Sequence, residues 1–124
     1  MRKVIIESPY GGTPKEVANN TKYARAAMRD CLLRGESPYA SHLLYTQPGV
    51  LKDDVSEERK QGIEAGFAWR ECAEATVVYI DFGVSHGMKL GIAAAEELRK
   101  KNPNHVIEYR TLPESDLVTL GLKK

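Results

Sequence analysis

The sequence has few of the patterns that mark a metal centre, a disulfide scaffold or a membrane anchor. Its two cysteines, Cys31 and Cys72, form neither a CxxC motif nor a metal-ligand spacing. The three histidines, His42, His86 and His105, are scattered, and no pair has the i, i+4 spacing of a helical zinc site. No apolar run reaches the length of a membrane span or a signal peptide. These absences predict a cytoplasmic protein with free, buried thiols, no metal and no cofactor.

Strong charge and the common phosphate motifs are also missing. The 18 Lys and Arg residues nearly balance the 17 Asp and Glu residues, so no strong field attracts nucleic acid or an anionic membrane. A P-loop would end in Gly-Lys-Ser/Thr, and a Rossmann fingerprint would follow the first strand, where Ser8-Pro9-Tyr10-Gly11-Gly12 stands. The expected partner is therefore a small molecule rather than nucleic acid or a membrane.

Short β-branched runs alternate with amphipathic segments along a chain long enough for one domain over residues 1–124. Strands are expected over 3–7, 37–41, 76–81 and 105–109. Helices are expected over 16–34, 56–74 and 87–101, with a short helix or ordered tail over 113–122. Gly35 is placed to end the first helix, and Ser56 to cap the second. The segment 42–55 is longer and more apolar than a plain connection between two elements, and such segments are often binding loops.

This alternation predicts an α/β fold, a three-layer α/β/α sandwich of the Rossmann-like kind. Strands that alternate with helices pair in parallel, so we expect a mostly parallel sheet of four or five strands. The carboxyl ends of parallel strands share one edge of the sheet, where such folds bind ligands. Residues 8–13, 42–47 and 81–87 are expected to meet at that edge.

Three loops supply the ligand-binding candidates. Asp81 ends the strongest strand and could accept a sugar hydroxyl or act as a general base. Ser85 and the following backbone N–H groups at a helix start could hold a phosphate. The glycines after the first strand fit a simple turn equally well, and a lone histidine beside apolar residues is more often structural. The candidates are Ser8, Tyr10, Gly11, Gly12, His42, Tyr45, Asp81, Gly83, Ser85, His86, Gly87 and Met88.

The first strand ending in Ser8-Pro9-Tyr10, and Asp81-x-Gly83-x-Ser85-x-Gly87 running on to Gly91-x-Ala93, resemble the nucleoside 2-deoxyribosyltransferase-like superfamily. Most of the chain is similar to small uncharacterised domains of that superfamily from bacteriophages and actinobacteria. The resemblance implies a ligand that is a nucleoside or a nucleoside 5′-monophosphate, whose N-glycosidic bond the better-known members cleave with a glutamate nucleophile. It also implies that Ser85 and Gly87 hold the phosphate and that Asp81 is the acid at the strand end.

The glutamate of that resemblance is missing. The transferase pattern Asp-x-Gly-Thr-x-x-Glu would put it at Gly87, and the 5′-monophosphate pattern Ser-x-Gly-x-Gly-x-Glu at Gly91. Glycine has no side chain to attack an anomeric carbon. The remaining carboxylates that could reach the pocket are Asp81, Glu7 and Glu64, although a solvated position is favoured for Glu64.

Two main hypotheses follow. The first is a module that binds a nucleotide or an ADP-ribose-like ligand without breaking it, with Tyr10 or Tyr45 stacking on the base. In a phage setting it could sequester a signalling nucleotide. The second is an N-glycosidase or ribosyltransferase in which another carboxylate acts, and a weaker third is an inhibitor of another protein. The two partly apolar faces of residues 56–74 also predict a homo-oligomer.

Overall fold

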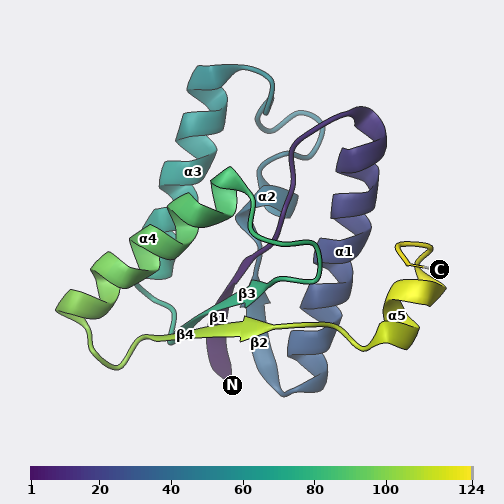
Figure 1. Ribbon diagram of the computed structural model, residues 1–124. Helices are drawn as coiled ribbons and strands as arrows, with labels where there is room; N and C mark the ends of the chain where they lie inside the picture. Colours follow the sequence, from purple (N-terminus) through teal and green to yellow (C-terminus); the bar gives the residue numbers. More distant parts are fainter. Residues whose placement is uncertain (124) are drawn as a thin grey trace.

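The computed structural model describes residues 1–123 and alternates strands with helices (Figure 1). The strands are β1 (Arg2–Glu7), β2 (Glu36–Tyr39), β3 (Ala75–Tyr79) and β4 (Val106–Arg110). The helices are α1 (Pro14–Leu33), α2 (Ser41–Leu44), α3 (Ser56–Arg70), α4 (His86–Lys101) and α5 (Glu114–Thr119).

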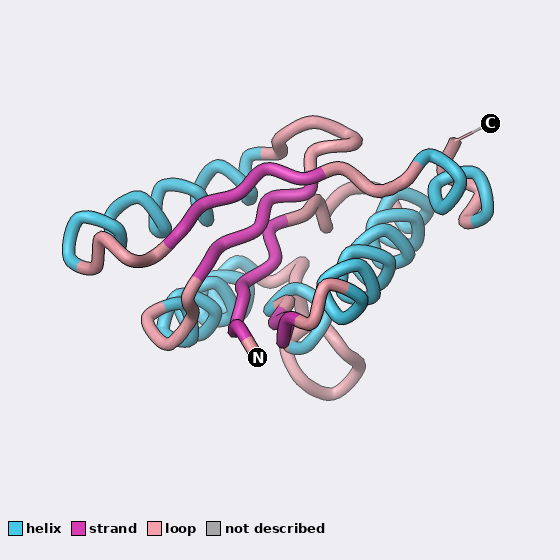
Figure 2. The backbone as a smooth tube through the Cα atoms, turned by 90° about the horizontal axis from the view of Figure 1, so that it is seen from below, coloured by secondary structure: helices cyan, strands magenta, loops and turns pink. Residues whose placement is uncertain are grey.

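The strands form one four-stranded sheet in the order β2-β1-β3-β4, and every neighbouring pair is parallel. Helices α1 and α5 lie on one face of this sheet, and α3 and α4 lie on the other (Figure 2). This arrangement confirms the predicted three-layer α/β/α sandwich. The carboxyl ends of all four strands consequently share one edge.

Local sequence sets where the first helix begins and ends. Thr13 caps α1, since its side chain accepts a hydrogen bond from the Glu16 N–H while the Glu16 carboxylate accepts one from the Thr13 N–H. Gly35 follows the helix with a φ of +79°, in the left-handed region that glycine adopts without strain. The helix therefore begins at Pro14, two residues before the predicted start.

The predicted N-cap of the second long helix was wrong by one residue. Val55 is the N-cap of α3 and makes no side-chain cap bond, while Ser56 is already helical. The helix also ends at Arg70 instead of continuing to Glu74. The chain turns there because the Glu74 N–H donates to the Lys3 carbonyl at 2.8 Å, which starts the approach to β3.

The second strand also differs from the prediction. It begins at Glu36, and Pro38 lies inside it rather than at its first position. An edge strand tolerates an internal proline because the missing N–H faces away from the sheet, and β2 is the edge strand. The connection that follows contains the short helix α2.

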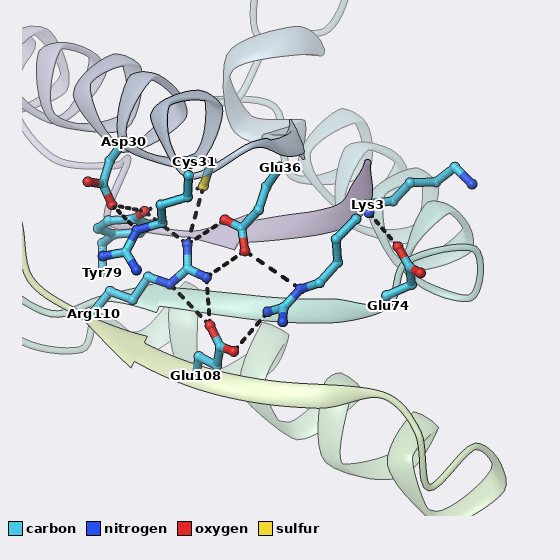
Figure 3. Close-up of polar contacts among 10 residues, drawn as sticks. Lys3, Asp30, Cys31, Glu36, Glu74, Tyr79, Glu108 and Arg110 are labelled. Atoms are coloured by element: carbon cyan, nitrogen blue, oxygen red, sulfur yellow. Dashed lines mark hydrogen bonds and ion pairs between the residues drawn. The ribbon is translucent and has the colours of Figure 1, made fainter.

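The core on the α1 face is apolar over its centre and charged at one side. Val4, Ile6, Tyr23, Ala27 and Val77 are almost fully buried there. Beside them, Arg110 and its ionic partners form a buried cluster, which Figure 3 shows under α1. The polar cluster takes the place of further apolar side chains on this part of the sheet.

The two cysteines have different surroundings. Cys31 is buried in the core, and burial raises the pKa of its thiol. Cys72 is exposed, because it lies in the turn after α3 and not within a helix, so the expectation of a second buried thiol was wrong. Both thiols are free, as predicted. Within residues 1–123, no helix is long and apolar enough to cross a bilayer.

Candidate functional site

A cavity of about 280 Å³ opens at the carboxyl end of β1, beside the first turn of α4. Its lining comes from the end of β1 and the loop after it, from α2, from α3 and from the start of α4. These segments meet because parallel strands end at one edge and α3 and α4 share one face of the sheet (Figure 1). The cavity gathers Ser8, Tyr10, Gly11, His42, Ser85, His86, Gly87 and Met88 from the predicted ligand-binding set, together with Glu7.

Glu7 supplies a buried carboxylate to this cavity. It is the last residue of β1, and its side chain points to the face opposite Ile6, toward α3 and α4. Its Oε2 accepts a hydrogen bond from the Arg70 guanidinium at 3.1 Å. Burial raises the pKa of the Glu7 carboxyl, and this effect outweighs the opposing charge of Arg70. The carboxyl therefore lies in a site that disfavours its charged form.

Arg70 is held rigidly behind Glu7. Its Nη1 donates to the Thr76 hydroxyl at 2.8 Å, and its guanidinium lies 5.6 Å from the centre of the Phe67 ring. Thr76 in turn bonds His105 Nε2 at 2.8 Å. The side chain of Arg70 is only 4% exposed, so the position of Glu7 is fixed from within the core.

Gly91 of α4 leaves the space that the Glu7 carboxylate occupies. A Cβ added at residue 91 would clash with Glu7 Oε1, because it would lie closer than real Cβ atoms approach another heavy atom. A side chain at this position would displace the carboxylate from its contact with Arg70. The position of the Glu7 carboxylate thus depends on the absence of a side chain at residue 91.

Ser8 and His42 form a hydrogen-bonded pair on the other wall of the cavity. Ser8 Oγ lies 2.8 Å from His42 Nε2, which ties α2 to the end of β1. Burial lowers the pKa of His42 to about 4, so the imidazole is neutral at neutral pH. The Tyr10 ring meets the imidazole edge-on, with centroids 6.1 Å apart. A neutral imidazole fixes the direction of the serine hydroxyl without adding a charge.

The start of α4 presents backbone donors to the same space. Ser85 is the N-cap, and its Oγ accepts from the Met88 N–H at 3.3 Å. The N–H groups of His86 and Gly87 precede the first intrahelical bond, which Lys89 makes to the Ser85 carbonyl. A Cβ added at Gly87 would meet nothing within 4 Å, so the approach to these donors is open. Such a helix start favours an anion.

Sequence reasoning missed three charged residues that line the cavity: Asp53, Arg59 and Arg70. Arg59 stands three residues after Ser56, where a capping acid is usual if Ser56 is the N-cap, and that departure was the only local signal. Arg70 follows Phe67 at helical spacing on the buried face of α3. A buried arginine requires an acidic partner, and this requirement could have pointed to Glu7.

Asp81, the acid expected at the strand end, does not line this cavity. Its carboxylate accepts hydrogen bonds from the Tyr23 hydroxyl and from the Leu112 N–H, the latter at 3.0 Å. Its own N–H donates to the Tyr23 oxygen at 3.0 Å. Asp81 thus joins the end of β3 to α1 and to the segment after β4, on the other face of the sheet from Glu7.

The remaining predicted residues also lie outside the cavity. Glu64 is exposed on α3, because the small residues around it pack toward α2, where a Cβ on Gly66 would meet Ser41 Oγ at 2.8 Å. The Tyr45 hydroxyl is bonded by that of Tyr39. Gly12 and Gly83 have positive φ angles in the turns before α1 and after β3.

Over residues 1–123, no group of three or more His, Cys, Asp and Glu side chains is arranged to hold a metal ion. A comparison with curated proteins finds no match for the chain. A family model described as a domain of unknown function, DUF7768, matches residues 2–104, a span that contains every residue lining the cavity. The chain therefore belongs to the DUF7768 family.

Proposed function

We propose that the protein binds a nucleotide in the cavity between β1 and α4. The observation that carries the proposal is the meeting of two kinds of group around one space. The first turn of α4 and Arg59 are suited to a phosphate, and Glu7 and Ser8 are suited to sugar hydroxyls. Both halves of a sugar phosphate find complementary groups there.

The phosphate would lie against the backbone N–H groups of His86 and Gly87. Arg59 adds a positive charge on the opposite wall, and a guanidinium binds phosphate oxygens in a bidentate manner. The resemblance to the nucleoside 2-deoxyribosyltransferase-like superfamily also assigns the phosphate to Ser85 and Gly87. The ribose partner differs from the expectation: Glu7 takes that role because the carboxylate of Asp81 is already bonded to Tyr23 and Leu112.

Tyr10 is the aromatic residue placed to stack on the base. It lines the cavity, whereas Tyr45 is engaged with Tyr39 and does not. A protein that binds a nucleotide in this way without breaking it would sequester it.

The same proposal includes a homo-oligomer, because Trp69 of α3 is exposed and offers apolar surface for contact with a second copy.

Calorimetric titration with a panel of nucleoside 5′-monophosphates tests the proposal. Gly87→Ala adds a methyl group beside the phosphate donors, where the fold has room for it. We expect this variant to weaken binding by about tenfold or more, equivalent to about 1.4 kcal/mol, with no loss of thermal stability. Glu96→Ala, on an exposed part of the same helix, serves as the matched control. If no monophosphate binds, or if Gly87→Ala leaves the affinity unchanged, the proposal is wrong.

A second candidate function is hydrolysis of the N-glycosidic bond, with Glu7 as the nucleophile. The clash between Glu7 Oε1 and a Cβ built at residue 91 favours it. This overlap puts the carboxylate where a side chain from the expected glutamate position would begin. Ionised Glu7 would attack the anomeric carbon as the bond to the base breaks, and the base would leave with the electron pair and take a proton from water. A second water would then hydrolyse the glycosyl ester and release the carboxylate.

Chromatography of a nucleotide incubated with the protein separates the two candidates. Hydrolysis predicts free base from the unchanged protein and none from Glu7→Gln, while the variant still binds the nucleotide. A nucleotide recovered intact from the unchanged protein excludes hydrolysis and leaves the binding function.

A further inference from the structure

A second hollow, larger than the first, adjoins the cavity on the far side of Tyr10. Its volume is about 540 Å³, against about 280 Å³ for the cavity at Glu7. It lies between α1 and the segment from β2 through α2 to Pro48. Tyr10 lines both spaces and therefore lies where the two adjoin.

Contacts from α1 and α2 fix the position of Tyr10. Asn20 of α1 donates from Nδ2 to the carbonyl oxygens of Tyr10 and Gly11, at 3.1 and 3.2 Å. On the other side, the Tyr10 ring rests edge-on against His42. The relative position of the two spaces is therefore fixed by these contacts from α1 and α2.

The lining of the larger space suits a flat ring system with a charged group at its rim. Met28, Tyr39 and Leu43 are partly buried and present apolar surface. Arg25 and Gln47 are exposed at the border and can reach an anion or the edge of a ring. We refer to this space as the α1–α2 groove.

Size favours a ligand that occupies both spaces. Cavities that enclose a typical organic ligand measure about 300–1,000 Å³, and the Glu7 cavity alone lies just below that range. A single nucleotide would leave the larger of the two spaces to solvent. A ligand with two nucleoside units would bury its second base against the apolar surface of the α1–α2 groove, which is otherwise exposed to solvent.

We propose that the ligand is a dinucleotide whose two halves lie on either side of Tyr10. The first sugar phosphate lies at the start of α4, and the second base lies in the α1–α2 groove with Arg25 beside the linking phosphates. This inference rests on the proposed function and adds to it the size class of the nucleotide.

Calorimetry with matched ligand pairs tests it. Each nucleoside 5′-monophosphate is compared with the symmetrical dinucleotide in which two copies are joined 5′ to 5′ through a pyrophosphate. For the preferred base we expect the dinucleotide to bind about tenfold more tightly or better, or about 1.4 kcal/mol. Two groove variants, Arg25→Glu and Thr21→Trp, should remove that advantage and leave the affinity for the monophosphate within about a factor of two.

Arg29→Glu is the matched control, because Arg29 is an exposed arginine one turn along α1 that does not line the groove. It should preserve the advantage of the dinucleotide. A dinucleotide that binds no more tightly than its monophosphate, or groove variants that weaken both ligands equally, would overturn the dinucleotide inference and leave nucleotide binding intact. If neither kind of ligand binds, both proposals fail.

Discussion

Two regions of this protein bury an arginine against a glutamate, and the surroundings act on the two in opposite directions. In the cluster around Arg110, hydrogen bonds from Arg110 lower the pKa of Glu36 and raise that of Arg110 itself. In the cavity, burial raises the pKa of Glu7 despite Arg70. The first region stabilises its charges, and the second makes ionisation more difficult.

The difference follows from the number of partners. Arg110 donates two hydrogen bonds to Glu36, at 2.7 and 2.8 Å, and two to Glu108, at 2.6 and 3.2 Å (Figure 3). Arg2 also donates a hydrogen bond to Glu108. Among residues 1–123, the Glu7 carboxylate accepts a hydrogen bond from Arg70 alone. A network in which every buried charge has several partners is typical of a structural role. A carboxyl in a cleft whose surroundings disfavour its ionised form is more typical of a binding or catalytic site.

The largest expected effect comes from breaking the compensated cluster. Arg110→Met leaves Glu36 buried without its main partner, so the free energy of unfolding should fall by about 3–5 kcal/mol in urea denaturation at neutral pH. The pKa of Glu36 is lowered by folding, so this stabilisation is present above pH 4.5 and lost as acid protonates the carboxylate. The difference between the two proteins should therefore shrink in acid. A loss well below 1 kcal/mol would show that the cluster is not structural.

The next effect concerns His42 and the pH dependence of stability. Folding lowers its pKa from 6.5 to about 4, so the folded state resists protonation. Its contribution is complete above pH 6.5 and is lost as the pH falls toward about 4, by up to about 3 kcal/mol. His42→Gln should lack this part of the pH dependence of unfolding. His86→Gln, at an exposed histidine of the same cavity, should retain it, and equal slopes for both variants would refute the burial of a neutral His42.

A smaller effect links Glu7 to Gly91. Gly91→Ala should displace the Glu7 carboxylate from Arg70 and cost about 1–2 kcal/mol. In Glu7→Ala the space is empty, so the same change at residue 91 should cost much less. A double-mutant cycle measures this coupling, and additive losses would contradict the contact.

The smallest effect belongs to an exposed ion pair. Lys100 and Glu97 lie 2.8 Å apart on α4, and their side chains are 72% and 71% exposed. Solvent and salt screen such a pair, so Glu97→Ala should leave the thermal midpoint unchanged within error. A clear fall in the thermal midpoint would show that solvent does not screen this exposed pair.

The layers of the fold and the place of the site could be predicted from the alternation of strands and helices. That alternation put Ser8, His42 and Ser85 at one edge, and the structure brings them to one cavity. The face of the sheet to which each side chain points could not be predicted in the same way. Side chains alternate along a strand, so Tyr79 and Asp81 face α1 while Glu7 faces α3 and α4.

The arginines of the site depended on packing that no local pattern contains. Arg59 and Arg70 reach the cavity because α3 lines it together with the end of β1 and the start of α4. Asp53 reaches it because the connection after α2 folds back toward Tyr10. A sequence shows that such residues are charged, but their distance from Glu7 is set by tertiary contacts.

Mass spectrometry of the small molecules released when the purified protein is denatured tests the central claim most directly. The account predicts an intact nucleotide, bound in near-stoichiometric amount and lost in Gly87→Ala. A protein that releases no nucleotide, and that also retains none after incubation with a nucleotide pool, would contradict it.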